Sequence, residues 1–96
     1  MLIVARHIID GTLKRHSAAR KPMLRWFAIA EMAIWNDISD ARETFPTADA
    51  IKGTPLTCFN IGGNSYRLIT IVSYQRGDVV IRELLTHAEY TKKYVR

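Results

Sequence analysis

The chain has 96 residues, of which 48% are hydrophobic and 24% charged, and its formal net charge at pH 7 is +5. This length allows one modest hydrophobic core, so we expect residues 1–96 to form a single domain. The apolar stretches are too short to cross a bilayer and the N-terminus lacks the pattern of a signal peptide, which favours a cytoplasmic protein without membrane contact. The only cysteine, Cys58, excludes an intramolecular disulfide and argues against a thiolate zinc site. It is expected to be a small buried hydrophobic residue.

Charge is distributed unevenly along the chain. Residues 1–25 hold six basic side chains and one acidic side chain, a balance of +5. Residues 31–49 hold five acidic and one basic, a balance of −4, and the remainder holds seven basic and three acidic, a balance of +4. Clustered Lys and Arg release counterions from phosphates, which favours a polyanion as partner. The plain alternative is a solvated helix face that happens to be basic.

The first third of the chain predicts a short strand and two helices. The β-branched run at residues 2–4 favours a strand at a sheet edge. Helical spacing begins near Arg6, although Gly11 weakens that first helix by about 1 kcal/mol relative to Ala. A stronger amphipathic helix is expected with Pro22 at its first position, running to about Ile34. Its apolar stripe, expected to face a sheet, comprises Met23, Trp26, Phe27, Ile29, Ala30 and Ile34.

The middle of the chain predicts one short helix and a connection. Several possible N-cap residues precede a helix that begins at about Ser39 and must end before Pro46. Residues 47–55 contain Gly53 and Pro55 and predict a surface connection.

The second half predicts three antiparallel strands that follow one another as a meander. Residues 56–61 and 66–74 form the first two strands around the turn at residues 62–65, where two glycines supply positive φ angles. A second turn at residues 75–78 leads to the third strand at residues 79–85.

Arg67 stands out in the middle strand of this meander. The strand is largely apolar on both faces, so we expect Arg67 to emerge at the edge beside the glycine turn. A guanidinium held there by Tyr66 and Asn64 matches two phosphate oxygens with its planar donors. Judged from its position alone, Arg67 could equally be a surface arginine in a salt bridge and not a phosphate-binding group.

A capping box, Thr86-His87-Ala88-Glu89, indicates that the last strand turns directly into a terminal helix. His87 is then the first helical residue, and Tyr90 lies one turn on, on about the same side. The amides and dipole of a helix N-terminus attract a phosphate and disfavour an imidazolium, which suits a neutral His87 acting as a general base. The ordinary alternative is a capping motif closed by packed side chains. Lys92 and Lys93 either hold RNA or keep the tail soluble.

These motifs resemble the HigB family of toxins of type II toxin–antitoxin systems, over nearly the whole chain. The resemblance rests on Phe59-Asn60-Ile61-Gly62-Gly63-Asn64-Ser65-Tyr66-Arg67-Leu68-Ile69, on Thr86-His87-Ala88-Glu89-Tyr90 and on Phe45-Pro46-Thr47-Ala48-Asp49. It implies the small α+β fold of the RelE/ParE superfamily: an antiparallel sheet of a short N-terminal strand and the meander, packed by two N-terminal helices, with a short C-terminal helix. The chain departs from the family pattern at Thr91, where an acidic residue is usual, and at Asp10-Gly11, which interrupts the first helix.

The resemblance also implies an activity, a metal-independent endoribonuclease without a cofactor that cuts translated messenger RNA on the ribosome and so inhibits growth. A HigA-type antitoxin neutralises such a toxin and provides its only link to operator DNA. By the motifs of the superfamily, Arg67 stabilises charge on the phosphorane, His87 moves a proton, and Tyr90 stacks on a base or shares the proton transfer. Further RNA contacts are expected at Asn64, Tyr66, Arg76, Lys92 and Lys93.

Two other functions fit parts of the sequence. A gyrase-directed toxin of the ParE branch shares the fold but does no RNA chemistry, and His87 and Tyr90 count against it. A non-catalytic RNA-binding module uses a basic face and exposed aromatic side chains for stacking only.

Overall fold

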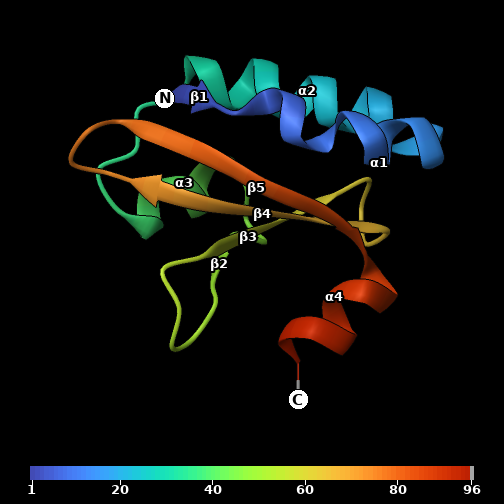
Figure 1. Cartoon of the computed structure of the whole chain (residues 1–96). Helices are drawn as coiled ribbons and strands as arrows, with labels where there is room; N and C mark the ends of the chain where they lie inside the picture. The colour runs from blue at the N-terminus through green and yellow to red at the C-terminus, as the bar shows by residue number, and fades with distance from the viewer. Residues whose placement is uncertain (96) are drawn as a thin grey trace.

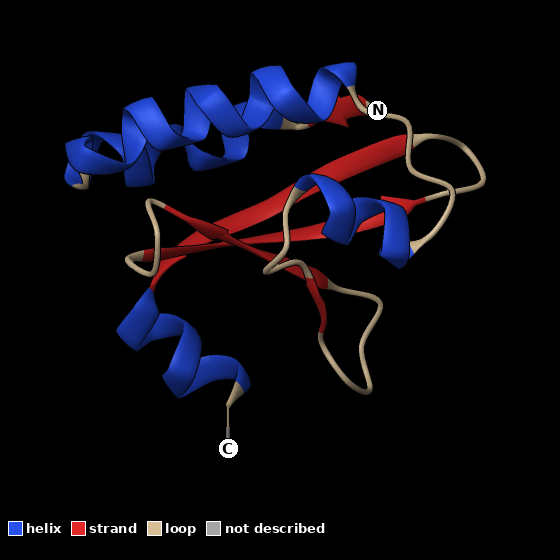
Figure 2. Cartoon of the chain, turned by 180° about the vertical axis from the view of Figure 1, so that it is seen from behind, coloured by secondary structure: helices blue, strands red, loops and turns tan. Residues whose placement is uncertain are grey.

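The computed structural model describes residues 1–95, whose strands form one sheet in the order β1-β5-β4-β3-β2. The strands are β1 (Leu2–Val4), β2 (Asp49–Ala50), β3 (Thr57–Ile61), β4 (Tyr66–Ser73) and β5 (Asp78–Thr86). The α-helices are α1 (Asp10–Arg15), α2 (Arg20–Met32), α3 (Ile38–Thr44) and α4 (His87–Tyr94), and short 3-10 turns lie at η1 (Arg6–Ile9) and η2 (Ser17–Ala19). Figures 1 and 2 show α1 and α2 side by side over one face of the sheet and α4 beyond its other face. No helix in this part of the chain has the length and apolar character needed to span a membrane.

The predicted meander of β3, β4 and β5 is confirmed, since both neighbouring pairs are antiparallel. The sheet is mixed, however, because β1 lies parallel to β5 at the edge, and the expectation of a wholly antiparallel sheet was wrong. A three-residue strand carries no local information on its direction, which the path of the chain through the helices decides. The connection predicted at residues 47–55 also contains β2, which is too short to produce a recognisable alternation and pairs antiparallel with β3.

The N-terminal helices differ in detail from the prediction. The first begins as a 3-10 turn after Ala5, which adopts a left-handed φ of 64°, and α1 then buries no residue. Pro22 is the third residue of α2 and not the first, as predicted from the sequence. Proline also fits the third position, because the N–H groups of the first helical turn have no acceptor within the helix. The helix ends at Met32 because the chain becomes extended at Ala33. As a result Trp35, and not Ile34, enters the core.

The core lies between α2, α3 and the sheet and is centred on aromatic side chains. Phe59 is fully buried, with its ring centroid 5.1 Å from that of Trp26 and 5.8 Å from that of Trp35. Phe45, at the end of α3, stacks on Trp26 of α2 with the two ring centroids 5.5 Å apart, and so connects these two helices within the core. The assignment of Trp26 to the core is therefore confirmed, whereas Ile29, which was also expected in the stripe, is 41% exposed.

Side chains alternate along β4, so every second residue of this strand lies on the face of the sheet opposite the aromatic core. Leu68 points into the aromatic core, and Ile69 points to the opposite face, where it forms a small cluster with Ile51 and Cys58. Tyr90 and Tyr94 of α4 pack against this cluster. Arg67, two residues before Ile69 in an extended strand, lies on the same face. This alternation brings the predicted arginine beneath the C-terminal helix.

Candidate active site

Arg67 is held from several sides at the start of β4. Its Nη1 donates to the carbonyl oxygens of Asn64 and Tyr66, both at 3.1 Å. Its Nη2 donates to Asn64 Oδ1 at 2.6 Å and lies 3.0 Å from Nδ1 of His87. Only 8% of the residue is exposed, so the guanidinium is a fixed, buried group and does not emerge at the edge beside the glycine turn as the sequence predicted. Its four terminal N–H groups are matched by these four contacts.

His87 is positioned by the capping box predicted from the sequence, which the structure confirms. Thr86 Oγ1 accepts from the Glu89 amide at 3.2 Å, and Glu89 Oε1 accepts from the Thr86 amide at 2.8 Å. The His87 amide also donates to the carbonyl of Ser65 at 3.0 Å, which ties α4 to the β3–β4 turn. His87 is thus the first residue of α4, and it is exposed.

The contact between Arg67 and His87 requires a hydrogen-bond acceptor on the imidazole. A guanidinium has no lone pair to offer, so His87 Nδ1 must be the acceptor. A neutral ring that accepts at Nδ1 carries its proton on Nε2. In that tautomer the one lone pair of the ring is turned toward Arg67.

Tyr90 completes the cluster one turn further along α4. Its ring centroid lies 5.7 Å from Cζ of Arg67, and the side chain is half-buried against Cys58 and Ile69. Burial, with a smaller contribution from Cys58, raises the pKa of the Tyr90 phenol. The phenol therefore remains protonated at neutral pH, which suits stacking or donation and not the role of a base.

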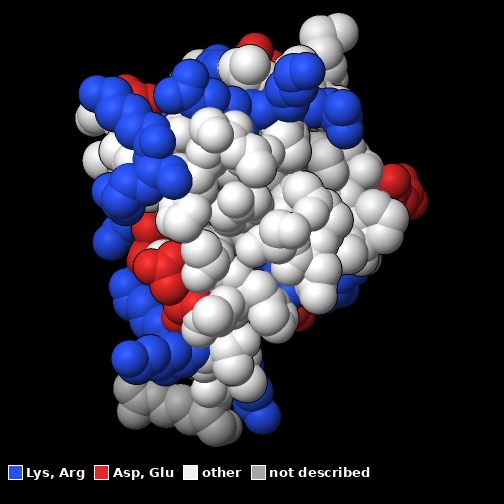
Figure 3. Space-filling view, turned by 90° about the vertical axis from the view of Figure 1, so that its right-hand side faces the viewer, with Lys and Arg blue, Asp and Glu red and all other residues white. Residues whose placement is uncertain are grey.

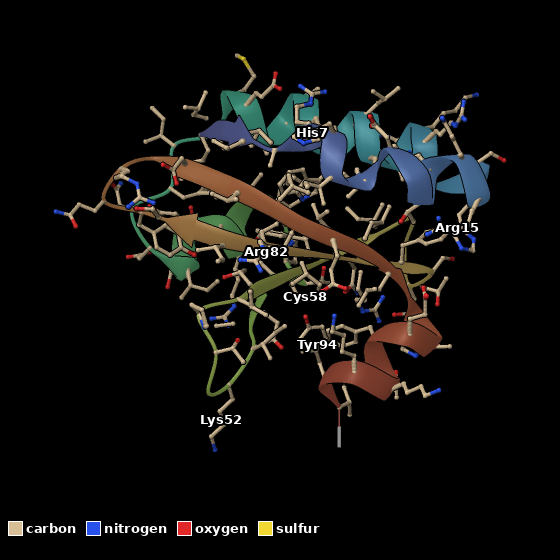
Figure 4. All side chains as sticks on the ribbon, in the orientation of Figure 1. His7, Arg15, Lys52, Cys58, Arg82 and Tyr94 are labelled. Atoms are coloured by element: carbon tan, nitrogen blue, oxygen red, sulfur yellow. The ribbon has the colours of Figure 1, made fainter. Side chains whose placement is uncertain are left out.

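Cys58 lies on the same face of the sheet, on the side that α4 covers, and Figure 4 shows it between the sheet and Tyr94. Burial raises the pKa of its thiol to about 11, and the opposing effect of the Arg67 charge is smaller. A neutral thiol that is 2% exposed is neither a nucleophile nor a metal ligand. Its expected role as a small buried hydrophobic residue is confirmed.

Of the residues expected to contact RNA, Asn64 is the one that the fold brings to the cluster, through its bond to Arg67. Tyr66 points to the opposite face because it is adjacent to Arg67 in an extended strand, and its ring meets His16 edge-on at 5.9 Å. Arg76 lies in the turn at the far end of β4, where it pairs with Asp78 at 3.0 Å. About 20 Å of strand separates that turn from Arg67. The side chains of Tyr66 and Arg76 therefore lie away from the cluster, and their contacts with RNA stay a prediction.

The two lysines of α4 have different surroundings. Lys93 pairs with Glu83 of β5 at 2.9 Å, and the pKa of the Lys93 ammonium is raised mainly by that hydrogen bond. Lys92 is exposed on α4. Lys93 is thus engaged in attaching α4 to the sheet, whereas Lys92 makes no ion pair within residues 1–95.

The sequence did not reveal that the end of α1 approaches the start of α4. The pKa of Glu89 is lowered chiefly by its bond from the Thr86 amide, with smaller contributions from the positive charges of His16 and Arg15. Figure 4 shows Arg15 above the start of α4. His16 is half-buried against Tyr66. No local pattern marks these two residues, since only the packing of α1 on the sheet places them there.

A small mixed sheet, with two helices over one face and a C-terminal helix over the other, is consistent with the fold of a RelE-like toxin. The family model described as HigB_toxin, RelE-like toxic component of a toxin–antitoxin system, matches residues 19–93. Because this match spans most of the chain, the protein belongs to the HigB toxin family. It is thus the toxic component of a toxin–antitoxin system, and an antitoxin is its implied partner. A comparison with curated proteins finds no match.

Proposed function

We propose that the protein is a ribosome-dependent endoribonuclease that cuts messenger RNA without a metal ion and is neutralised by a HigA-type antitoxin. The observation that carries this proposal is the cluster of Arg67, His87 and Tyr90, in which Arg67 Nη2 and His87 Nδ1 lie 3.0 Å apart. A guanidinium, an imidazole and a phenol at one place are suited to binding a phosphodiester and moving protons around it. Membership of a RelE-like toxin family supports the same reaction class.

The proposed reaction is attack of a ribose 2′-hydroxyl on its own 3′-phosphate. The new bond joins the 2′-oxygen to phosphorus, and the bond to the 5′-oxygen of the next nucleotide breaks, giving a cyclic phosphate and a 5′-hydroxyl. A phosphate oxygen that takes over the donor Nη2 of Arg67 releases Nδ1 of His87. That lone pair accepts the 2′-hydroxyl proton, and the imidazolium returns a proton to the leaving 5′-oxygen. Arg67 meanwhile stabilises the charge on the phosphorane.

Substrate placement is assigned to the ribosome and to groups around the cluster. A bent message held in the decoding region reduces what the toxin itself must supply. Tyr90 stacks on a base beside the scissile phosphate. Basic side chains line the upper and left margins of the molecular face that carries the β3–β4 turn, as Figure 3 shows, and they favour the approach of a polyanion.

The test is cleavage of a translated message by purified toxin on ribosomes, with transcript 5′ ends mapped before and after addition. Arg67→Ala is expected to slow cleavage by about 100–1000-fold, as for loss of one oxyanion donor. Arg82→Ala is the matched control, because Arg82 is an exposed arginine of β5 outside the cluster. Circular dichroism must show that Arg67→Ala retains its fold, since the guanidinium also bonds the β3–β4 turn. Cleavage by Arg67→Ala at the wild-type rate contradicts the assignment.

The alternatives give different results in the same strain. A gyrase-directed toxin induces DNA damage signalling before message is lost. A non-catalytic RNA-binding module slows translation without creating new 5′ ends. We expect new ends on translated messages first, and none on messages that lack a start codon.

A further inference from the structure

A groove of about 180 Å³ lies between the first half of α2 and the end of β3, where the β3–β4 turn begins. Figures 1 and 2 show the start of α2 above this turn. One wall of the groove is formed by Pro22, Arg25, Trp26 and Ile29 of α2, and the opposite wall by the chain at residues 60–63. Pockets for drug-sized ligands have volumes of about 300–1,000 Å³, so this groove admits one small ring system and not a folded segment.

The groove reaches the candidate active site across β3. Asn60 lines the groove and is paired with Arg67 in the register of β3 and β4. Paired residues of antiparallel strands lie on the same face of the sheet, with Cβ atoms about 4.5–5.5 Å apart. Because β2 pairs with β3 at Thr57 and Cys58, no strand of residues 1–95 lies beside the edge of β3 at Asn60. A chain bound across this free edge therefore passes from Arg67 into the groove without meeting another strand.

The groove combines apolar surface, an unpaired cation and accessible backbone. Ile29 is 41% exposed, and Arg25 is exposed and makes no ion pair within residues 1–95. Gly62 and Gly63 carry no side chains, so a ligand approaches the backbone of the turn closely. Unpaired RNA bases are recognised by packing of their faces and by hydrogen bonds to their edges, and arginine is suited to the adjoining phosphate.

Trp26 gives an independent indication of a ligand. It lines the groove and is 2% exposed, yet its indole Nε1 makes no hydrogen bond within residues 1–95. Buried indole N–H groups usually have a partner. The carbonyl oxygens and ring nitrogens of a base are acceptors of the kind that this donor lacks.

We propose that the groove holds one unpaired base of the message, from a nucleotide that flanks the phosphate bound by Arg67. The base packs against Ile29, Asn60 meets the nucleotide at the entrance, and Arg25 pairs with its phosphate. This inference rests on the proposed function, because an RNA substrate at Arg67 is what brings a neighbouring base to the groove. It predicts that one position beside the cut is read by the toxin itself.

The binding test uses the full-length toxin and a labelled single-stranded RNA whose 2′-hydroxyls are methylated, so that it cannot be cleaved. By fluorescence anisotropy, Ile29→Glu is expected to weaken binding by about 10-fold or more, because stacking of one base contributes that much. Met32→Glu is the matched control, since Met32 is 86% exposed on the same helix, lies outside the groove and gives the same change in charge. Circular dichroism must show that both variants are folded.

A second pair of variants avoids any change to apolar packing. Arg25→Ala and Arg82→Ala each remove one exposed arginine, of which only the first lines the groove. Both lose some general attraction to the RNA, and Arg25→Ala is expected to lose several-fold more affinity than Arg82→Ala.

RNAs with a single abasic nucleotide, moved along the strand, locate the bound base. At one position the abasic RNA is expected to bind the wild type about as weakly as the intact RNA binds Ile29→Glu. At that position Ile29→Glu is expected to lose nothing further, because the two changes remove the same contact. At the other positions the difference between the wild type and Ile29→Glu is expected to remain.

Several results would overturn the proposal. Equal affinities of Ile29→Glu and Met32→Glu would show that the groove does not contact the RNA. A difference that persists at every abasic position would assign the effect of Ile29→Glu to charge and not to a base. Lack of measurable binding by the wild type would also exclude a base-binding groove.

Failure of the nuclease proposal gives a different result. A toxin that shows this binding pattern but cuts no translated message supports the groove and refutes the nuclease activity. A toxin that cuts message at the same rate and positions in the wild type and Ile29→Glu supports the nuclease activity and refutes the groove.

Discussion

Thr86→Ala removes one half of the capping box that begins α4 and is expected to loosen that helix without unfolding the protein. The Thr86 hydroxyl accepts from the Glu89 amide at 3.2 Å, and replacing such an N-cap by Ala costs about 1 kcal/mol. The helix is otherwise held by few contacts, because none of its residues is buried. It is attached by the half-buried Tyr90 and Tyr94, by the Lys93–Glu83 ion pair and by the bond from the His87 amide to Ser65. A loss of about 1 kcal/mol raises the open population of α4 about fivefold.

Native-state hydrogen exchange measures this opening directly. Amides of α4 are expected to lose about fivefold in protection, and those of β4 to keep theirs, because the lost bond belongs to the helix alone. Thr86→Ser is the control, since it keeps the hydroxyl and the protection. Wild-type protection of α4 in Thr86→Ala, or an equal loss in β4, would refute the reasoning. Because His87 and Tyr90 lie on α4, message cleavage is expected to be slower in Thr86→Ala than in the wild type and to be retained in Thr86→Ser.

The pH dependence of the same helix follows from the other half of the capping box. The backbone N–H of Thr86 lowers the pKa of Glu89 in the folded protein. A carboxylate with a lowered folded-state pKa stabilises the fold at pH values above its unfolded pKa of about 4.3, and this contribution is lost as the pH falls below that value. Protection factors in α4 are thus expected to drop on acidification in the wild type and to respond less in Glu89→Gln. An equal response in both proteins would exclude Glu89 as the titrating group.

The remaining predictions concern the core, the buried thiol and a turn. Phe59→Ala is expected to lower the free energy of unfolding by about 3–5 kcal/mol in urea titrations, and a loss below about 1 kcal/mol would contradict its central place in the core. The raised pKa of Cys58, about 11, predicts slow reaction with a disulfide reagent at pH 8 and faster reaction once Tyr90→Ala uncovers the thiol; equal rates would argue against that cover. Gly63, at a φ of 68° with open space where a Cβ would lie, should tolerate Asn better than Ala, the latter costing about 1–2 kcal/mol by thermal unfolding; equal stability would contradict strain.

Much of the fold could be predicted because its signals are local. The N-cap of α3 and the capping box of α4 each involve residues three positions apart, and the glycine turn is four residues long. Such elements are stabilised by bonds between near neighbours, which are visible in the order of side chains along the chain. The placement of Arg67, His87 and Tyr90 near one another followed from these elements and from the family resemblance.

The amino-acid sequence by itself determined the family, the meander and the start of the terminal helix, because each depends on residues close together in the chain. Only the tertiary structure decided that β1 runs parallel to β5, that Arg67 is buried with four contacts, and that the Tyr66 side chain and Arg76 lie away from its guanidinium. It also decided that His16 approaches α4. Those features depend on strand register, on which face a residue occupies and on the packing of helix ends. Contacts between segments distant in sequence set all three, and no short pattern records them.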